Sequence, residues 1–159
     1  MREEFYRFIP ELVKKDDSVY VISPDFSFPK DFALKHENPS HLINTGLSEA
    51  ATIGMASGMA LSGLKPYVIG ITPFVLERAF EQIKLDLVWQ HANVKLIGYW
   101  DYPTAGPTHL TKDVGQLCNI LGIQFYEPKS SSEARELFSY ENDLKRPCFF
   151  YLTKDRSLK

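Results

Sequence analysis

Cysteine is scarce in this sequence, and its placement excludes both a disulfide framework and a cysteine-rich metal site. The 159 residues contain two cysteines, Cys118 and Cys148. They stand alone in the sequence and form neither a CxxC pair nor a metal-binding spacing. We interpret both as reduced core residues, which is typical of a cytoplasmic protein.

Long apolar runs and an excess of either charge are also missing. No stretch of 18 or more apolar residues is present, so we expect no transmembrane helix and no membrane partner. The first four residues, Met1-Arg2-Glu3-Glu4, contain no apolar signal core. The formal net charge is -2, which argues against a nucleic-acid partner because phosphate neutralisation needs clustered Lys and Arg.

The composition is that of an ordinary globular protein, with 44% hydrophobic and 24% charged residues. A chain of this length fits one domain, and we assign residues 1–159 to a single one. A domain of this size buries roughly 70% of its unfolded surface, so it needs no disulfide or structural metal.

Apolar runs alternate with helical patterns along the whole chain. Runs rich in β-branched and aromatic residues predict strands at 18–22, 41–44, 66–71, 94–99, 123–126 and 148–152. Helical patterns occupy about 5–13 (with a kink at Pro10), 47–62, 74–90, 111–121 and 130–138. The strands are mostly apolar on both faces, which predicts an α/β fold: a three-layer, doubly wound, mostly parallel sheet of about six strands with helices on both faces. Ligands bind at the carboxyl ends of the strands in such sheets.

A carboxylate opens the second predicted helix. Glu49 follows a short strand and lies in the first helical turn, where the helix dipole alone would stabilise it. Ala50, Gly54 and Gly58 recur at four-residue spacing on that helix. Glycine costs roughly 0.5–1 kcal/mol inside a helix, so this face indicates close packing, either against another helix or against a partner subunit.

One histidine lies at a similar strand-to-helix turn. His109 ends the turn Gly106-Pro107-Thr108-His109, between a predicted strand and a predicted helix. A lone histidine at a turn is usually structural. This position is also where the architecture binds ligands, so both readings stay open here.

Three segments together resemble a known family. The runs 46–60 and 73–83 and the turn 106–109 resemble, in this order and spacing, the pyrimidine-binding domain of transketolases. Deoxyxylulose-phosphate synthase and the pyruvate dehydrogenase beta subunit are similar but more distant. The resemblance covers nearly the whole chain and implies the thiamine-diphosphate-binding fold.

The resemblance implies roles for individual residues. Glu49 falls on the family glutamate that hydrogen-bonds the aminopyrimidine ring of thiamine diphosphate and activates the cofactor. His109 falls on the histidine that points at the substrate. Both are therefore expected to be catalytic, and no residue of this chain is expected to bind metal.

Four further residues match positions near the cofactor. Phe74 is the candidate for stacking on the pyrimidine ring, although Thr72 and Val75 occupy neighbouring positions where the family has aromatic residues. A core residue at the start of the helix is the alternative interpretation of Phe74. Arg78 and Gln82 match positions near the same ring or at the subunit interface. Asp25, after the first strand, matches an acidic position facing the cofactor, and a turn residue following Pro24 is the alternative interpretation.

The family's magnesium and diphosphate motif is not in the sequence. No Gly-Asp-Gly followed by Asn occurs in it. We therefore expect a transketolase-like partner subunit to bind the diphosphate and Mg²⁺, in a heterotetramer with two copies of each chain, and we expect the lone chain to self-associate.

The resemblance predicts a transferase that moves a two-carbon ketol unit between ketose and aldose substrates. Thr104-Ala105 stand where many transketolases carry an acidic, sugar-reading residue, so the substrate is not expected to be an ordinary pentose-phosphate sugar. One alternative is a split decarboxylase, acyloin synthase or 2-oxoacid dehydrogenase acting on a 2-oxoacid. A second is a non-catalytic interaction module with the same fold.

Overall fold

A parallel sheet forms the centre of the molecule. The computed structural model describes residues 1–24, 28–100 and 105–153. Six strands follow the order β2-β1-β3-β4-β6-β5, and every pairing between neighbours is parallel. The strands are β1 (Val19–Ser23), β2 (Leu42–Asn44), β3 (Lys65–Ile71), β4 (Lys95–Tyr99), β5 (Gln124–Tyr126) and β6 (Cys148–Leu152). All six predicted strands are confirmed.

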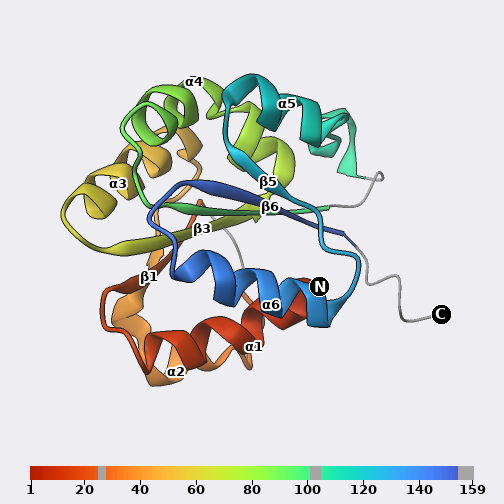
Figure 1. The fold of residues 1–159 in the computed structure, drawn as a ribbon. Coiled ribbons are helices and arrows are strands. Elements are labelled where there is room, and N and C mark those ends of the chain that lie inside the picture. The colour runs from red at the N-terminus through yellow and green to blue at the C-terminus, as the bar shows by residue number, and fades with distance from the viewer. Residues whose placement is uncertain (25–27, 101–104, 154–159) are drawn as a thin grey trace.

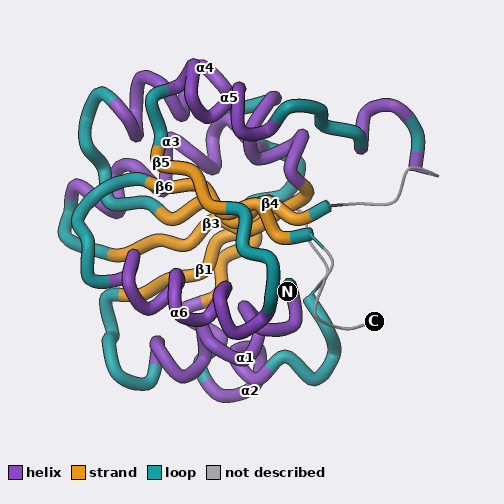
Figure 2. The backbone as a smooth tube through the Cα atoms, turned by 45° about the vertical axis from the view of Figure 1, so that its right-hand side comes forward, coloured by secondary structure: helices purple, strands orange, loops and turns teal. Residues whose placement is uncertain are grey.

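Helices cover both faces of this sheet (Figure 1). One layer contains α1 (Arg2–Val13), α2 (Ala33–Glu37) and α6 (Ser131–Asn142). The other contains α3 (Glu49–Leu61), α4 (Phe80–Gln82) and α5 (Val114–Leu121), with the π-helical segments η2 (Pro73–Glu77) and η3 (Ile83–Val88) beside α4. Figure 2 shows the strands as a single layer between these two groups. The predicted three-layer α/β architecture is confirmed.

Each face of the sheet has its own apolar core. Successive strand residues point to opposite faces, and in β3 the side chains of Tyr67 and Ile69 join the core under α1 and α6. Val68, between them, joins the core under α3 and the π-helical segments. This two-sided burial explains why the strands are apolar at nearly every position.

The helices differ from the prediction mainly where the chain follows β3. The predicted helix 74–90 consists of η2, α4 and η3. Its first turn is π-helical rather than α-helical: the N–H of Arg78 donates to the carbonyl of Pro73, five residues earlier, at 3.1 Å, whereas an α-helix joins residues four apart. Other changes are small. Helix α1 continues past Pro10 to Val13, α3 and α5 begin after the predicted starts, and α6 extends to Asn142. The short helix α2 and the 3-10 turns η1 (Pro39–His41) and η5 (Pro107–His109) were not predicted, because segments of three to five residues are too short to show a helical periodicity.

Two glycines let the start of η2 press against the sheet. Gly70 and Gly98 are direct partners in the β3–β4 pairing. A Cβ atom at Gly98 would lie 2.7 Å from Thr72 Oγ1 and would overlap the Phe149 ring, and one at Gly70 would lie 2.6 Å from Val75 Cγ1. The segment that carries Phe74 therefore packs directly on the strand backbones.

The connections diverge at β1, which pairs with β2 on one side and β3 on the other. The chain runs from β1 to β2 and then crosses to β3, so the carboxyl ends of β1 and β3 form the topological switch point where ligands bind in such sheets. The β2–α3 connection leads to Glu49, and β3 leads into η2. The two predicted site segments that carry Glu49 and Phe74 therefore begin at this edge.

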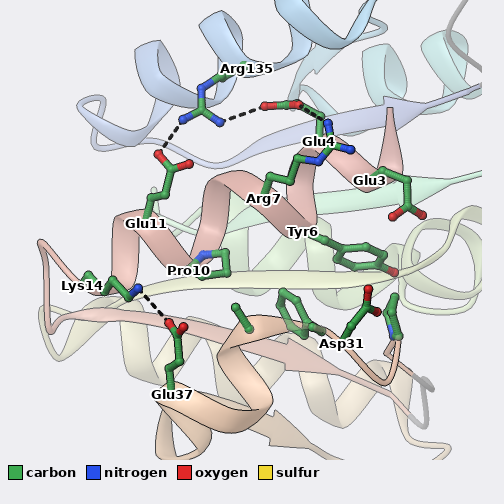
Figure 3. Close-up of a pocket in the computed structure, with 13 residues that line it drawn as sticks. Glu3, Glu4, Tyr6, Arg7, Pro10, Glu11, Lys14, Asp31, Glu37 and Arg135 are labelled. Atoms are coloured by element: carbon green, nitrogen blue, oxygen red, sulfur yellow. Dashed lines mark hydrogen bonds and ion pairs between the residues drawn. The ribbon is translucent and has the colours of Figure 1, made fainter.

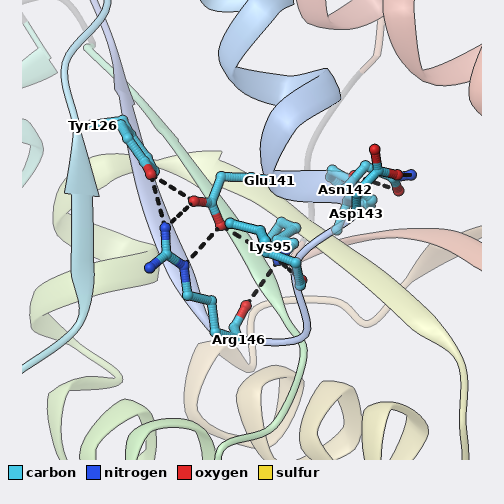
Figure 4. Close-up of polar contacts among 8 residues, drawn as sticks. Lys95, Tyr126, Glu141, Asn142, Asp143 and Arg146 are labelled. Atoms are coloured by element: carbon cyan, nitrogen blue, oxygen red, sulfur yellow. Dashed lines mark hydrogen bonds and ion pairs between the residues drawn. The ribbon is translucent and has the colours of Figure 1, made fainter.

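A buried polar network holds the opposite, amino-terminal edge (Figure 4). The ammonium of Lys95 donates to the carbonyls of Leu144 and Arg146 at 2.9 and 2.8 Å. Glu141 accepts hydrogen bonds from Arg146 Nη2 and the Tyr126 hydroxyl, both at 2.5 Å. These contacts tie α6 to β4, β5 and the start of β6. They lie at the end of the sheet opposite the switch point.

Among the described residues, no helix has both the length and the apolar character needed to cross a membrane.

Candidate functional site

The loop between β2 and α3 fixes Glu49 at the start of its helix. Gly46 adopts a positive φ of 70°, and its N–H donates to Asn44 Oδ1 at 2.9 Å. The N–H of Thr45 donates to the carbonyl of Ser23 at 3.1 Å, which ties the loop to the end of β1. Glu49 is the first residue of α3, and its side chain is only 9% exposed.

Hydroxyl groups brace this helix start, and sequence reasoning missed them. The hydroxyls of Thr45 and Thr52 lie 2.6 Å apart, and Ser48 Oγ donates to the carbonyl of Thr45 at 2.9 Å. Thr52 also contacts the carbonyl of Ser48 at 2.9 Å. The signal that could have revealed them is the group of three hydroxyl residues around the predicted N-cap. Together they leave the Glu49 backbone little freedom.

Four predicted site residues form one continuous chain of contacts. Arg78 Nη1 lies 3.0 Å from Glu49 Oε1 in an ion pair. The guanidinium carbon of Arg78 lies 3.8 Å from the centroid of the Phe74 ring. The Phe74 ring meets the His109 ring edge-to-face, with the centroids 4.9 Å apart. Residues from three different strand-to-helix connections therefore meet at the carboxyl edge of the sheet.

The structure separates Phe74 from its two neighbours. Thr72 is 1% exposed, and its hydroxyl donates to the carbonyl of Tyr99 at 3.0 Å. Val75 is also 1% exposed and belongs to the core beneath α3. Phe74 is partly exposed and contacts both His109 and Arg78. It is therefore the one of these three side chains that is available at the site.

Gln82, a further predicted site residue, does not join this cluster within the described residues. Gln82 lies at the end of α4 and is half-buried, and no hydrogen bond or ion pair within the described part of the chain links it to Glu49, Phe74 or His109. Asp25 lies outside the described residues.

The glycine face of α3 is explained in part by packing within the chain. A Cβ atom at Gly54 would contact Asp86 Oδ2 of η3 at 3.8 Å, and Ser57 Oγ donates to the carbonyl of Asp86 at 2.7 Å. A Cβ atom at Gly58 would have nothing within 4 Å, and Gly58 is exposed. Close packing against η3 therefore accounts for Gly54 but not for Gly58.

The donor set fits an aminopyrimidine ring. A buried carboxyl can exchange a hydrogen bond and a proton with a ring nitrogen, and a neighbouring aromatic face can stack on a flat heterocycle. Glu49 and Phe74 supply these two groups at one place, and His109 adds an acid–base group beside them. Within the described ranges, no group of three or more His, Cys, Asp or Glu side chains is arranged to hold a metal ion.

A separate, charged cleft of about 640 Å³ lies on the other helical layer (Figure 3). It is lined by α1, residues 29–32, both ends of α2 and Arg135 of α6, and no predicted site residue within the described ranges lines it. Its charges largely satisfy one another: Arg135 binds Glu4 and Glu11 at 2.9 and 2.6 Å, and Lys14 binds Glu37 at 2.8 Å. These ion pairs join α1 to α2 and α6, so the charged side chains of the cleft are explained by their role in holding the three helices together.

Comparisons with known proteins agree with this geometry. The family model described as "Transketolase, pyrimidine binding domain" matches residues 1–157. The chain is 31% identical over 150 residues to an apulose-4-phosphate transketolase subunit of Actinobacillus succinogenes, covering 92% of this chain and 48% of that protein. It is 32% identical over 145 residues to the 6-deoxy-6-sulfo-D-fructose transketolase subunit SqwH of a Clostridium species, covering 87% and 44%.

Solved structures show the same fold. A split-gene transketolase described as an inactive beta4 tetramer superposes with a TM-score of 0.86 at 22% identity, covering 97% of this chain and 51% of that one. The transketolase from Leishmania mexicana gives a TM-score of 0.81 at 17% identity, covering 96% and 25%. The chain spans about half the length of the curated transketolase subunits that it matches. From the family match over 157 residues, we conclude that this chain belongs to the transketolase pyrimidine-binding domain family.

Proposed function

We propose that this chain is the pyrimidine-binding part of a split, thiamine-diphosphate-dependent transketolase that transfers a two-carbon ketol unit between sugar-type substrates. The observation that carries the proposal is the contact chain from the buried Glu49 carboxyl through Arg78 and Phe74 to His109 at the carboxyl edge of the sheet. In this proposal, residues 1–159 form a single pyrimidine-binding domain. The subunit names of the two relatives support a split enzyme.

Each side chain has a defined task in this proposal. Glu49 holds and donates a proton at the ring nitrogen of the aminopyrimidine, and Phe74 presents an aromatic face to the ring. His109 donates a hydrogen bond or a proton to a substrate oxygen. Asp25 faces the cofactor, and Arg78 and Gln82 lie near the ring or at the subunit interface. Bound thiamine diphosphate supplies the carbanion chemistry itself.

The other half of the site comes from a partner in this proposal. The subunit names of the relatives support a transketolase-like partner subunit, which in this proposal binds Mg²⁺ and the diphosphate through a Gly-Asp-Gly motif followed by Asn. We propose a heterotetramer with two copies of each chain, and self-association when the partner is missing. A mixed tetramer of this kind gives each active site residues from two polypeptides.

The cysteine chemistry is consistent with a cytoplasmic enzyme. Cys118 and Cys148 are both buried and unpaired. Burial raises the pKa of the Cys118 thiol to about 12, so it stays a protonated thiol at neutral pH. Reduced, unreactive core cysteines are typical of a reducing compartment, and we therefore propose the cytoplasm.

Reconstitution tests the proposed function. We expect calorimetry with thiamine diphosphate and Mg²⁺ to detect weak or no binding to this chain alone, because the diphosphate and metal carry much of the binding energy. Mixing it with a chain that carries the Gly-Asp-Gly…Asn motif, encoded beside it, is expected to restore binding and ketol transfer from a ketose. Sub-micromolar binding by this chain alone would contradict the split site. Turnover of 2-oxoacids without ketol transfer would instead favour the decarboxylase alternative.

Replacing His109 with alanine is expected to impair turnover more than cofactor binding. In this proposal the imidazole acts on the substrate, and losing a general acid–base group typically lowers the rate by about 10²- to 10⁴-fold. Cofactor affinity, measured by calorimetry in the reconstituted complex, is expected to change by less than about twofold. His36→Ala is the matched control, because His36 is an exposed histidine of α2 in the other helical layer and takes no part in the contact chain. Equal losses of affinity and rate would assign His109 a structural role.

A further inference from the structure

The guanidinium of Arg78 lies in the space that the proposed function gives to the cofactor ring. Its Nη1 is 3.0 Å from Glu49 Oε1, and its central carbon is 3.8 Å from the centroid of the Phe74 ring. A pyrimidine ring that meets the Glu49 carboxyl and stacks on this face of Phe74 needs the same two contacts. Arg78 and the ring therefore cannot both occupy this space, which we call the ring site.

Arginine is well suited to fill such a site. Its guanidinium is flat, carries several N–H donors and stacks on aromatic faces. These are the properties that let an aminopyrimidine hydrogen-bond a carboxylate and stack on phenylalanine. The other side of the cluster is already taken, because the edge-to-face contact with His109 uses part of the Phe74 ring. Arg78 thus satisfies both Glu49 and Phe74 in the absence of a ligand.

The surroundings of Arg78 allow it to leave. Its side chain is 45% exposed, whereas the Glu49 side chain is 9% exposed. The Arg78 backbone is held by the hydrogen bond to the carbonyl of Pro73, so only side-chain rotation is needed. Exposed ion pairs and cation–π contacts are individually weak, and water can replace the contacts of a departing guanidinium.

We propose that Arg78 occupies the ring site in the cofactor-free chain and rotates toward solvent when the aminopyrimidine binds between Glu49 and Phe74. This inference rests on the proposed function, and it adds that Arg78 competes with the cofactor. While the ring site holds no ligand, Arg78 supplies the counter-charge of the buried Glu49 carboxylate. Because it must leave before the ring binds, it lowers the chain's apparent affinity for the aminopyrimidine. Removing it is expected to tighten binding of the ring about five- to tenfold.

The test uses this chain and the free base 4-amino-5-hydroxymethyl-2-methylpyrimidine, which needs no diphosphate site. In NMR spectra of the free chain, protons of the Arg78 side chain are expected to shift upfield, because they lie over the Phe74 ring. Phe74→Leu and Glu49→Gln are expected to weaken this shift. Adding the pyrimidine is expected to return the Arg78 signals to the positions of an exposed arginine.

Three variants measure the competition in the same titration. Arg78→Met keeps the length but removes the charge and the donors, and is expected to bind the pyrimidine about five- to tenfold more tightly. Arg78→Lys keeps the charge without the flat group, and its affinity for the pyrimidine is expected to lie between those of the unchanged chain and Arg78→Met. Lys84→Met is the matched control, since Lys84 makes a cation–π contact with Trp89 at 5.1 Å and takes no part in the contact chain. Its affinity is expected to equal that of the unchanged chain.

The possible failures can be told apart. Weaker binding by Arg78→Met, or Arg78 signals that stay shifted when the pyrimidine is bound, would overturn the competition and leave the proposed function intact. Arg78 signals at ordinary exposed positions in the free chain would overturn it as well. Absence of binding at millimolar pyrimidine in every variant, including Arg78→Met, would overturn the ring site on this chain, whereas ketol transfer by the reconstituted complex tests the proposed function separately.

Discussion

Replacing Glu49 with glutamine is expected to lower the turnover of the reconstituted complex by about 10²- to 10⁴-fold. Glutamine has nearly the same shape as glutamate, but its amide cannot pass a proton to a ring nitrogen. The loop that positions residue 49 is held by backbone atoms and by Thr45, Ser48 and Thr52, so the substitution leaves the local structure in place. The large effect therefore falls on proton transfer.

Two measurements separate this effect from misfolding. Exchange of the cofactor's acidic thiazolium proton with solvent deuterium reports the step proposed for Glu49, and size-exclusion chromatography with light scattering reports assembly. We expect slow exchange with unchanged assembly. Glu81→Gln is the matched control, because Glu81 is an exposed glutamate of α4 and is expected to leave both unchanged. Exchange at the unchanged rate in Glu49→Gln would show that Glu49 has another role.

The sheet could be predicted because its strands are buried on both faces. Runs such as Val68-Ile69 and Phe149-Phe150 are apolar at consecutive positions, which a strand exposed on one face does not tolerate. The alternation of these runs with helical patterns then indicates a parallel sheet with helices on both sides. What the sequence could not supply was the wide helical turn at η2, because no periodicity distinguishes an α-helix from a short π-helical segment.

That turn decides which residue faces the site. A sequence comparison leaves Thr72, Phe74 and Val75 as alternatives, because a shift of one residue changes which of them faces the cofactor. In the structure, Thr72 bonds the carbonyl of Tyr99 and Val75 packs under Gly70, which leaves Phe74 next to Arg78. The choice depends on how Pro73 and the two sheet glycines let the segment approach the strands. It is a tertiary effect with no local signal.

The pairing of Glu49 with Arg78 was also not predictable from spacing. The two residues are 29 positions apart and belong to different strand-to-helix connections, which the parallel topology brings to one edge. Family resemblance placed both near the cofactor but did not place them in contact. The roles of Asp25 and Gln82 remain predictions. Asp25 lies outside the described residues, and Gln82 makes no hydrogen bond or ion pair with the other site residues within the described ranges.

The buried network at the amino-terminal edge of the sheet supplies the largest expected effect on stability. Glu141 is 1% exposed at its side chain, and Lys95 is 3% exposed, with 3.7 Å between Glu141 Oε2 and Lys95 Nζ. Burial by itself would raise the pKa of Glu141, but the hydrogen bonds from Arg146 and Tyr126 outweigh it and hold this pKa below its ordinary value of 4.5. Burial lowers the pKa of Lys95. Glu141 is thus kept as a carboxylate inside the protein by its partners.

Glu141→Gln is expected to lower the free energy of unfolding at pH 7 by about 3 kcal/mol, because removing one partner of a buried ion pair leaves the other without its counter-charge. The expected loss is at the lower end of the range for breaking a buried ion pair, because the Arg146 side chain is 42% exposed and can be solvated once Glu141 is neutral. The Lys95 side chain is 3% exposed and cannot. Urea unfolding followed by circular dichroism measures the change. Glu136→Gln, an exposed position on the same helix, is the matched control and is expected to change stability by less than about 0.5 kcal/mol.

The same variant is expected to alter the acid side of the stability profile. Because the folded pKa of Glu141 is below the unfolded value, its contribution is fully present above that unfolded value of about 4.5. It is lost as the pH falls through the lower folded pKa, where the carboxylate takes up a proton. Glu141→Gln has no such proton to bind, so the difference between the two proteins is expected to shrink progressively below pH 4.5. A constant difference across that range, or an unchanged urea midpoint at pH 7, would show that the Glu141 contacts with Arg146 and Tyr126 contribute little to holding α6 on the sheet.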